Sequence, residues 1–469
     1  MNNKAAQSAR IGLLGAGDRG SIYARFLSEA GGQIVAVVDQ DPVRARHLSD
    51  SVPDAIQFSN WKELLKKSEE LSLDAVVVAL PDREHLGPAL EFSRKGISVL
   101  LEKPVGLTIA ELDKMQRHVN HLRKKKIEAA IVVCHVLRYS QFFGTIRRLI
   151  QEGTIGEVRS ILHAENVSYF HFAHSYVRGN WAHSKKSSPV LLAKCSHDFD
   201  LIGWYASSEF TSVHCSGELR TFLPENAPAG ATQRCLDGCP HDSCLYHART
   251  TYLEGLPLKR EMARMRNGLA IVARFSLAWP RLFRRIPFLG RLYPWPYWPT
   301  TTIVSGPVTT ESVLDALRNG PYGRCVYTAH SDQPDHADTV IAFKNGVTAI
   351  MRLNGNAYQE ARTVRIEGTA GTLEGRFGQG GDLVLRKHGS HVSKRISVKV
   401  DQAGHLAEDR ALCFHFLEVL DCIGSDRTDA GTRQDCLQQS DSVLHQVIEG
   451  HRMALLAERS RTSGRTIFR

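Results

Sequence analysis

The sequence predicts an α/β protein in two parts. A parallel sheet covered by helices on both faces comes first, and an α+β region with a large, mostly antiparallel open sheet follows. Before about residue 140, short Val/Ile/Leu runs alternate with amphipathic helical patterns, which is typical of parallel strands buried on both faces. Beyond it, alternating strands separated by Gly-rich turns replace that pattern. We therefore expect one domain at 1–140 and a second at 141–469.

The first part is expected to contain five strands and four helices. The apolar runs predict strands at 11–14, 34–38, 74–80, 97–101 and 129–133. Helical spacing predicts helices at 21–30, 61–65, 85–96 and 107–124.

The second part is expected to be α+β. Alternation predicts strands at 161–167, 338–343, 347–353, 363–367 and 383–387. Insertions occupy about 215–330, helices at 409–423 and 435–456 are expected to pack back on either domain, and the arginine-rich tail from 459 is expected to be frayed. The open sheet is the expected surface for a homo-oligomer.

Composition limits the class of protein. The 469 residues suit two or three domains, and 59 Lys and Arg against 49 Asp and Glu give a net charge of +10. That excess leaves nucleic acid, an anionic membrane surface or an anionic substrate as partners. No secretory signal pattern or apolar run of about 18 residues stands out, so a cytoplasmic location is expected. The ten cysteines would then be free thiols, metal ligands or core residues.

A glycine-rich turn separates the first strand from the first helix. Gly15, Gly17 and Gly20 form the pattern G-x-G-x-x-G. The first glycine permits a tight turn, the second lets the backbone approach a pyrophosphate, and the third lets helix and strand pack closely. Asp39 closes the next strand, where a carboxylate accepts hydrogen bonds from ribose hydroxyls and repels a 2′-phosphate. The pattern predicts a Rossmann domain that binds NAD rather than NADP, with Arg19 as a further phosphate contact.

The order of several motifs resembles the Gfo/Idh/MocA family of oxidoreductases. The carriers of the resemblance are the segments VVVALPDREH at 76–85, LEKP at 101–104, LRY at 137–139, LIQEGTIGEV at 149–158 and LLAKCSHDFDLIGWY at 191–205, and Gly404-His405 followed by Glu408-Asp409. The resemblance implies a hydride transfer between NAD and a CH–OH group of a sugar, cyclitol or sugar derivative. With the glycine turn, it gives the predicted cofactor-binding set: Gly15, Gly17, Asp18, Arg19, Gly20, Asp39, Pro81, His85, Glu102 and Lys103.

Four residues are predicted to be catalytic. Lys103 follows a buried strand, and a partly buried lysine near other cations titrates low enough to relay a proton. His197 is the candidate acid or base on a helix, with Asp200 beside it at i+3. Many dehydrogenases of the family carry an Asp four residues before this His, whereas this chain has Ala193 followed by Lys194. Lys194 is the fourth candidate, as a second proton-transfer group or as an anion-binding group.

The predicted substrate contacts are His135, Arg138, Tyr139 and Asp198, which suit a polyol or an anionic sugar. Two alternatives to a dehydrogenase stay open. One is a redox-assisted glycosidase or lyase in which NAD transiently oxidises a sugar hydroxyl to a ketone. The other is a non-catalytic NAD-sensing regulator.

Two features of the insertions lie outside these motifs. Cys235, Cys239 and Cys244 come within ten residues, and we weigh a structural zinc site evenly against packed thiols. Arginines alternate with aromatic residues over 273–299. That pattern suits a membrane interface, nucleic-acid bases or an anionic substrate. The preferred interpretation is an insertion that packs on the sheet or on a neighbouring subunit, with no nucleic-acid partner and no membrane span.

Overall fold

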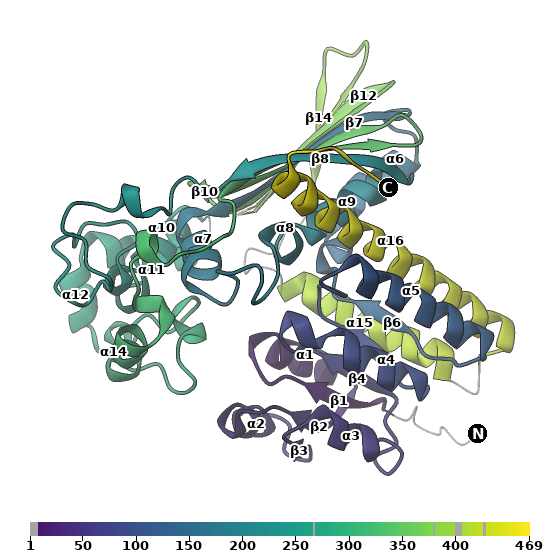
Figure 1. Cartoon of the computed structure of the whole chain (residues 1–469), viewed down its shortest axis with the longest axis horizontal. Helices are drawn as coiled ribbons and strands as arrows, with labels where there is room; N and C mark the ends of the chain where they lie inside the picture. The colour runs from purple at the N-terminus through teal and green to yellow at the C-terminus, as the bar shows by residue number, and fades with distance from the viewer. Residues whose placement is uncertain (1–7, 266–267, 379, 399–405, 425–427) are drawn as a thin grey trace.

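The structure is a computed structural model that describes residues 8–265, 268–378, 380–398, 406–424 and 428–469 (Figure 1). It contains a six-stranded sheet and a nine-stranded sheet. The predicted fold class is confirmed. The Gly404-His405 pair of the family resemblance lies outside the described residues.

The six-stranded sheet is parallel throughout and has the strand order β3-β2-β1-β4-β5-β6. Its strands are β1 (Arg10–Leu14), β2 (Gln33–Val38), β3 (Ile56–Phe58), β4 (Ala75–Val78), β5 (Ser98–Leu101) and β6 (Ile131–Val133). Its helices are α1 (Asp18–Glu29), α2 (Pro42–Ser49), α3 (Trp61–Lys66), α4 (Leu86–Arg94) and α5 (Ile109–Lys124). Strand order reverses between β1 and β4, so a ligand crevice is expected at their carboxyl ends. Sequence reasoning missed only the short β3 and α2 here.

The nine-stranded sheet has the order β14-β13-β12-β11-β7-β10-β9-β8-β15. Its strands are β7 (Val158–Ser168), β8 (Phe210–Glu218), β9 (His336–Phe343), β10 (Thr348–Ala357), β11 (Ala361–Gly368), β12 (Gly371–Gly378), β13 (Gly380–Lys387), β14 (Ser393–Ser397) and β15 (Ile467–Phe468). Of the described pairings only β7 with β10 is parallel. One face packs on α6 (Gln141–Gln151), α8 (Val190–Ala193) and α9 (Ser196–Ala206), and the other exposes Leu162, Val340 and Ile350.

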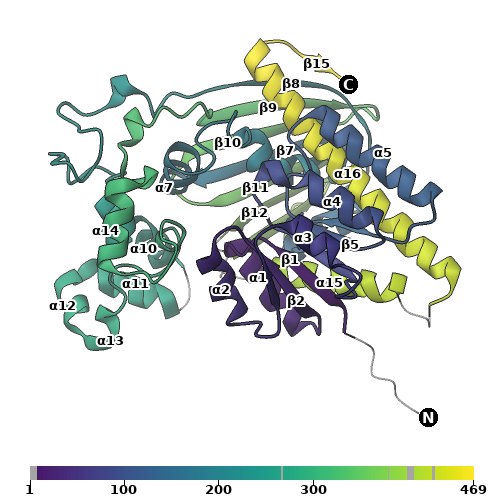
Figure 2. The ribbon, with the colours of Figure 1, turned by 60° about the horizontal axis from the view of Figure 1, so that its bottom comes forward.

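The two C-terminal helices join both sheets. Leu412 and Phe416 of α15 (Leu406–Gly424) share a core with β1 and α1. The 34-residue helix α16 (Ala430–Ser463) contacts α5 and β6 on one side and α9 and β8 on the other. Figure 2 shows α16 running diagonally across the molecule. Among the described helices, none is long and apolar enough to span a membrane.

Two expectations about the C-terminal region are wrong. Helices α15 and α16 bring the α-carbons of Cys422 and Cys436 to 6.7 Å, and these residues form a disulfide. The expectation that every cysteine is a free thiol, a metal ligand or a core residue is therefore wrong for this pair. The tail is also not frayed. Strand β15 pairs with β8, and Arg469 forms ion pairs with Glu209 and Glu449, so the chain end is held against the sheet.

The insertions form a helical lobe at one end of the molecule (Figures 1 and 2). It contains α10 (Leu256–Ala263), α11 (Gly268–Ala278), α12 (Pro280–Arg285), α13 (Pro287–Gly290) and α14 (Thr310–Asn319). A small core that includes Tyr252, Leu253, Val313 and Leu317 holds the lobe together.

Candidate active site

The glycine turn closes the carboxyl end of β1 against β4. Gly15 has a φ of +100°, and a Cβ on it would lie 2.2 Å from the Ala79 carbonyl oxygen. A Cβ on Gly20 would lie 1.9 Å from the Gly15 carbonyl oxygen. Neither position tolerates a side chain, whereas a Cβ on Gly17 would meet nothing within 4 Å. The backbone at Gly17 is therefore open, and the amino end of α1 follows directly, which is the arrangement that a pyrophosphate requires.

Asp39 lies at the end of β2 beside this turn. One carboxylate oxygen accepts the Ala16 backbone N–H at 2.7 Å, and the other accepts the Asp41 backbone N–H at 2.8 Å. Each oxygen retains a lone pair for a further donor. The open Gly17 backbone, the amino end of α1 and this carboxylate together fit an NAD dinucleotide, with Asp39 on the ribose side.

Arg19 is directed away from the predicted phosphate contact. Its Nε donates to Glu102 at 2.6 Å, and its two terminal nitrogens bind Asp409 at 2.6 and 2.9 Å. Tyr23 also donates to Glu102, at 2.6 Å. Burial alone would raise the pKa of Glu102, but Arg19 and Lys103 outweigh it and lower that pKa to about 2. The network fixes the end of β5 to α1 and α15, so Arg19 and Glu102 act here as positioning residues.

His85 connects two loops of the nucleotide-binding domain. Its two ring nitrogens lie 2.7 Å from the Leu80 carbonyl oxygen and 2.8 Å from the Pro104 carbonyl oxygen. The buried ring therefore links the chain after β4 to the chain after β5. Of the other predicted cofactor residues, Pro81 and Asp18 are both exposed, the latter in the first turn of α1.

Lys103 joins the nucleotide-binding sheet to the larger domain. Its Nζ donates to the Ala193 carbonyl oxygen at 2.5 Å, at the end of α8. Burial lowers the pKa of Lys103, and the neighbouring charge of Lys194 lowers it further against the opposing effect of Asp82 and Glu102. Since a low pKa favours the neutral amine, Lys103 is suited to accept a proton.

Asp82 brings a second segment to this junction. Its carboxylate accepts hydrogen bonds from the Trp181 indole nitrogen at 3.0 Å and from the Ser188 hydroxyl at 2.5 Å. Sequence reasoning missed Asp82, although it directly follows the Pro81 that the family resemblance singled out.

The α8–α9 segment turns two side chains outward. Between residues 190 and 202, all residues are buried except Lys194 and His197, which are half-buried. Lys194 lies 3.3 Å from Glu165 and 3.2 Å from Glu360. Burial acts to lower the pKa of Lys194, but these two carboxylates outweigh it and raise that pKa. Lys194 therefore stays a cation, whereas the surroundings of Lys103 lower its pKa.

A buried charge network continues inward from Lys194. Arg362 on β11 binds Glu165 at 2.7 Å and Asp198 at 2.8 Å, and His163 lies 2.7 Å from Asp198. Asp198 is fully buried. This placement therefore does not support the predicted role of Asp198 as a substrate contact, because Arg362 and the His163 ring cover its carboxylate.

Two of these partners were missed at the sequence level, although one carried a signal. Glu165 shares its strand face with Ile161, His163 and Val167, because alternate residues of a strand point to the same side. A carboxylate at an inward position indicates a partner cation. Glu360 carried no such signal, because it lies in the short loop between β10 and β11.

Asp200 lies beside His135. Arg138 binds Asp200 through two bonds of 2.7 Å, and His135 Nδ1 lies 3.1 Å from the same carboxylate. Burial acts to raise the pKa of Asp200, but Arg138 and His135 outweigh it and lower that pKa. The His135 ring in turn contacts the His197 ring at a centroid distance of 4.9 Å. Asp200 and Arg138 thus hold the His135 ring, and the His135 ring packs against His197.

Tyr139 is the predicted substrate contact that packs on α15. Its ring packs on His415 of α15, with 5.4 Å between centroids.

Comparison with known proteins adds to this geometry. A family model described as "Oxidoreductase family, NAD-binding Rossmann fold" matches residues 9–133, and one described as "GFO/IDH/MocA C-terminal domain" matches residues 143–235. The chain belongs to the Gfo/Idh/MocA family. The two matches cover the glycine turn, Lys103, Lys194 and His197, and the second one ends at residue 235, before the helices of the lobe.

Curated relatives in this family include inositol 2-dehydrogenases. The chain is 26% identical over 208 residues to inositol 2-dehydrogenase 1 of Saccharopolyspora erythraea and 27% identical over 215 residues to the enzyme of Corynebacterium glutamicum. Each alignment covers 44% of this chain and 57% of the relative, so it spans little more than half of the relative's length.

Solved structures of similar fold cover nearly the whole chain. The scyllo-inositol dehydrogenase of Lactobacillus casei, with bound NAD(H) and scyllo-inositol, has a TM-score of 0.58 at 15% identity, covering 98% of this chain and 99% of that one. An oxidoreductase of Agrobacterium radiobacter, in complex with NAD+, L-tartaric acid and magnesium, has a TM-score of 0.60 at 12% identity, covering 98% of each chain. At these identities the likeness shows the fold.

The cysteine cluster of this Gfo/Idh/MocA protein does not support the predicted zinc site. Cys235, Cys239 and Cys244 line one small cavity. Among the described residues, no group of three or more His, Cys, Asp or Glu is arranged to hold a metal. Cys235 instead accepts a hydrogen bond from Arg178 at 3.4 Å, so packing explains this thiol.

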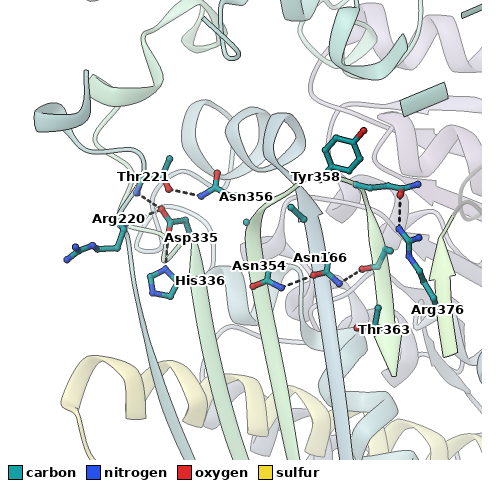
Figure 3. Close-up of a pocket in the computed structure, with 14 residues that line it drawn as sticks. Asn166, Arg220, Thr221, Asp335, His336, Asn354, Asn356, Tyr358, Thr363 and Arg376 are labelled. Carbon is teal, nitrogen blue, oxygen red and sulfur yellow. Dashed lines mark hydrogen bonds and ion pairs between the residues drawn. The ribbon is translucent and has the colours of Figure 1, made fainter. Parts of the chain in front are cut away.

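A polar cavity of about 570 Å³ lies on the opposite side of the large sheet (Figure 3). Asn354 donates to Asn166 at 2.7 Å across its floor, and Arg220 and Arg376 flank it. Asn166 follows Glu165 on β7, so the two side chains point to opposite faces of the sheet. The cavity is thus separate from the Lys103–Lys194 site.

Proposed function

We propose that the protein is an NAD-dependent oxidoreductase that transfers a hydride between NAD and a CH–OH group of a sugar or cyclitol. The observation that carries the proposal is the hydrogen bond from Lys103, at the end of β5, to the carbonyl of Ala193. It places the lysine that follows the nucleotide-binding sheet next to the α8–α9 segment that bears Lys194 and His197. The inositol dehydrogenases among the relatives support the same chemistry.

Each group has a distinct task in this proposal. When bound, NAD supplies the hydride acceptor at the carboxyl edge of the parallel sheet. Lys103, with its lowered pKa, accepts the proton of the reacting hydroxyl. His197 exchanges a proton as the second acid–base group, and the His135–Asp200–Arg138 group holds its ring in place. Lys194 stays charged and orients the substrate.

The charges around Lys194 favour a neutral polyhydroxylated substrate. Three carboxylates, those of Glu165, Glu360 and Asp198, already pair with Lys194 and its neighbour Arg362. Carboxylates also accept hydrogen bonds from hydroxyls, which a sugar or cyclitol presents in number. We therefore place the substrate hydroxyls beside the Lys194–Glu360 pair. Glu360 is the more exposed of the two carboxylate partners of Lys194.

The test has two stages. Calorimetry measures NAD binding first, and absorbance at 340 nm then follows NADH with myo-inositol, scyllo-inositol, neutral hexoses and hexuronates. We expect NAD binding and NADH formation with at least one neutral polyol. Absence of NAD binding contradicts the proposal. Release of p-nitrophenol from p-nitrophenyl glycosides without net NADH would replace it with the redox-neutral reaction.

We also propose that the open face of the large sheet mediates a homo-oligomer. Leu162, Ile350 and Val340 lie in one row across β7, β10 and β9, and each is more than a third exposed. Such a row on an uncovered sheet is typical of an interface. Light scattering should show an oligomer that Ile350→Lys dissociates, and a monomeric wild type would contradict the proposal.

A further inference from the structure

The helical lobe carries much of the excess positive charge of the chain. Between residues 262 and 310 there are seven arginines and no Asp or Glu. This segment alone therefore contributes +7 to a chain of net charge +10. Neither the proposed reaction nor the buried networks use it.

The same segment exposes large apolar side chains. Ile271 is 70% exposed, Trp279 64%, Leu282 49% and Phe288 70%. With Leu269 and Tyr297, six of the sixteen exposed large hydrophobic residues of the described chain fall within 269–297. Such a concentration within one segment is where an interaction surface is expected.

These side chains are exposed although the lobe has a packed interior. Trp295 and Phe283 are buried inside it, and Lys259 Nζ lies 4.6 Å from the Trp295 ring and 5.7 Å from the Phe283 ring. Helix α12 thus has an inward residue, Phe283, between the outward Leu282 and Arg284. The outward apolar side chains therefore lie on an ordered scaffold.

The arginines on this surface face solvent without carboxylate partners. Within the part of the chain that the structure describes, Arg281, Arg285 and Arg291 are exposed and form no ion pair. Arg284 stacks on the Tyr293 ring at 4.2 Å. Their charges are therefore available to an anionic partner.

We propose that the face of α11, α12 and α13 docks on the surface of an anionic lipid bilayer. Trp279, Leu282 and Phe288 would enter the headgroup boundary, and Arg281 and Arg285 would bind lipid phosphates. The lobe lies at the left extreme of the molecule in Figure 1. The protein is thereby a peripheral membrane protein rather than a spanning one.

The composition of the surface favours lipid over other partners. A second copy of the same surface would bring arginine against arginine with no acidic residue between them. A nucleic acid would use the arginines and aromatic rings but gives no role to the exposed Ile271 and Leu282. A bilayer boundary accommodates aliphatic, aromatic and cationic side chains together.

Sedimentation with vesicles tests the proposal on the full-length protein. Phosphatidylcholine vesicles with about 30% phosphatidylglycerol should bind it, phosphatidylcholine alone should bind it weakly, and added salt should release it. Trp279→Ser with Phe288→Ser should reduce the partition coefficient about tenfold or more. Arg281→Gln with Arg285→Gln should reduce it about 25-fold at low salt, about fivefold for each charge.

A matched control keeps the test specific. Val392→Ser with Arg395→Gln removes one exposed apolar residue and one exposed arginine near β14 and should leave binding unchanged. All variants should keep NAD binding, which separates this proposal from the proposed reaction. Equal vesicle binding by the lobe variants and the wild type would overturn it. So would tighter binding to a single-stranded RNA, or self-association, if the lobe substitutions abolished either.

Discussion

Lys103 and Lys194 face the same site in opposite electrostatic settings. Lys103 has a backbone carbonyl as its hydrogen-bond acceptor, and burial lowers its pKa. Lys194 lies between Glu165 and Glu360, which raise its pKa. The same side chain is thus suited to lose its proton in one setting and to stay charged in the other. We infer that Lys103 moves the proton and Lys194 positions the substrate.

Removing the amine of Lys103 should have the largest effect. Lys103→Met should lower kcat about 10³-fold with the best polyol, because general acid–base catalysis contributes this order of rate. NAD affinity should change little, since the Gly17 backbone and Asp39 are intact. Steady-state kinetics and calorimetry measure the two quantities. A variant that retains wild-type kcat would assign the proton transfer elsewhere.

His197 should behave like Lys103 rather than like Lys194. His197→Asn should lower kcat about 10²-fold and leave KM within a few-fold, since the ring is proposed to exchange a proton and not to bind substrate. His135→Asn is the matched variant on the supporting side. His135→Asn should lower kcat by less than His197→Asn does, and it should also shift the pH profile of kcat. A rise in KM alone for His197→Asn would move that residue to substrate binding.

Removing the charge of Lys194 should affect binding more than rate. Lys194→Gln should raise KM about 10-fold or more, as expected for a lost charge-assisted hydrogen bond, with a smaller change in kcat. Glu360→Gln should raise KM by less, because Glu165 still holds the lysine. A loss of kcat as large as that of Lys103→Met would remove the distinction between the two lysines.

Local sequence patterns predict the positions of the two lysines but not the surroundings of Lys194. The glycine turn, the strand before Lys103 and the helix bearing His197 are each contained in a few consecutive residues. Lys194 is a sequence-level candidate because it follows Ala193, where the family resemblance implies an acid. Its environment was not predictable, since Glu360 reaches it across 166 positions of sequence.

The surroundings of Arg19 and Asp198 could not be predicted for the same reason. Arg19 lies beside the glycine turn, but Asp409 binds it across 390 positions. Asp198 follows His197 in sequence, yet the turn of α9 directs it into the sheet toward Arg362. Neither set of partners could be predicted from neighbouring residues, because these ion pairs form between elements that only the tertiary fold brings together.

The pH dependence of kcat/KM for alcohol oxidation, in the wild type and in Lys194→Gln, tests the division between the two lysines most directly. In the wild type the rate should rise with pH as Lys103 loses its proton, with an apparent pKa below the ordinary lysine value. Lys194→Gln removes a positive charge that lowers the pKa of Lys103, so the pKa of Lys103 should rise. The account predicts that the acidic limb moves to higher pH. A limb that stays in place, or moves to lower pH, would contradict it.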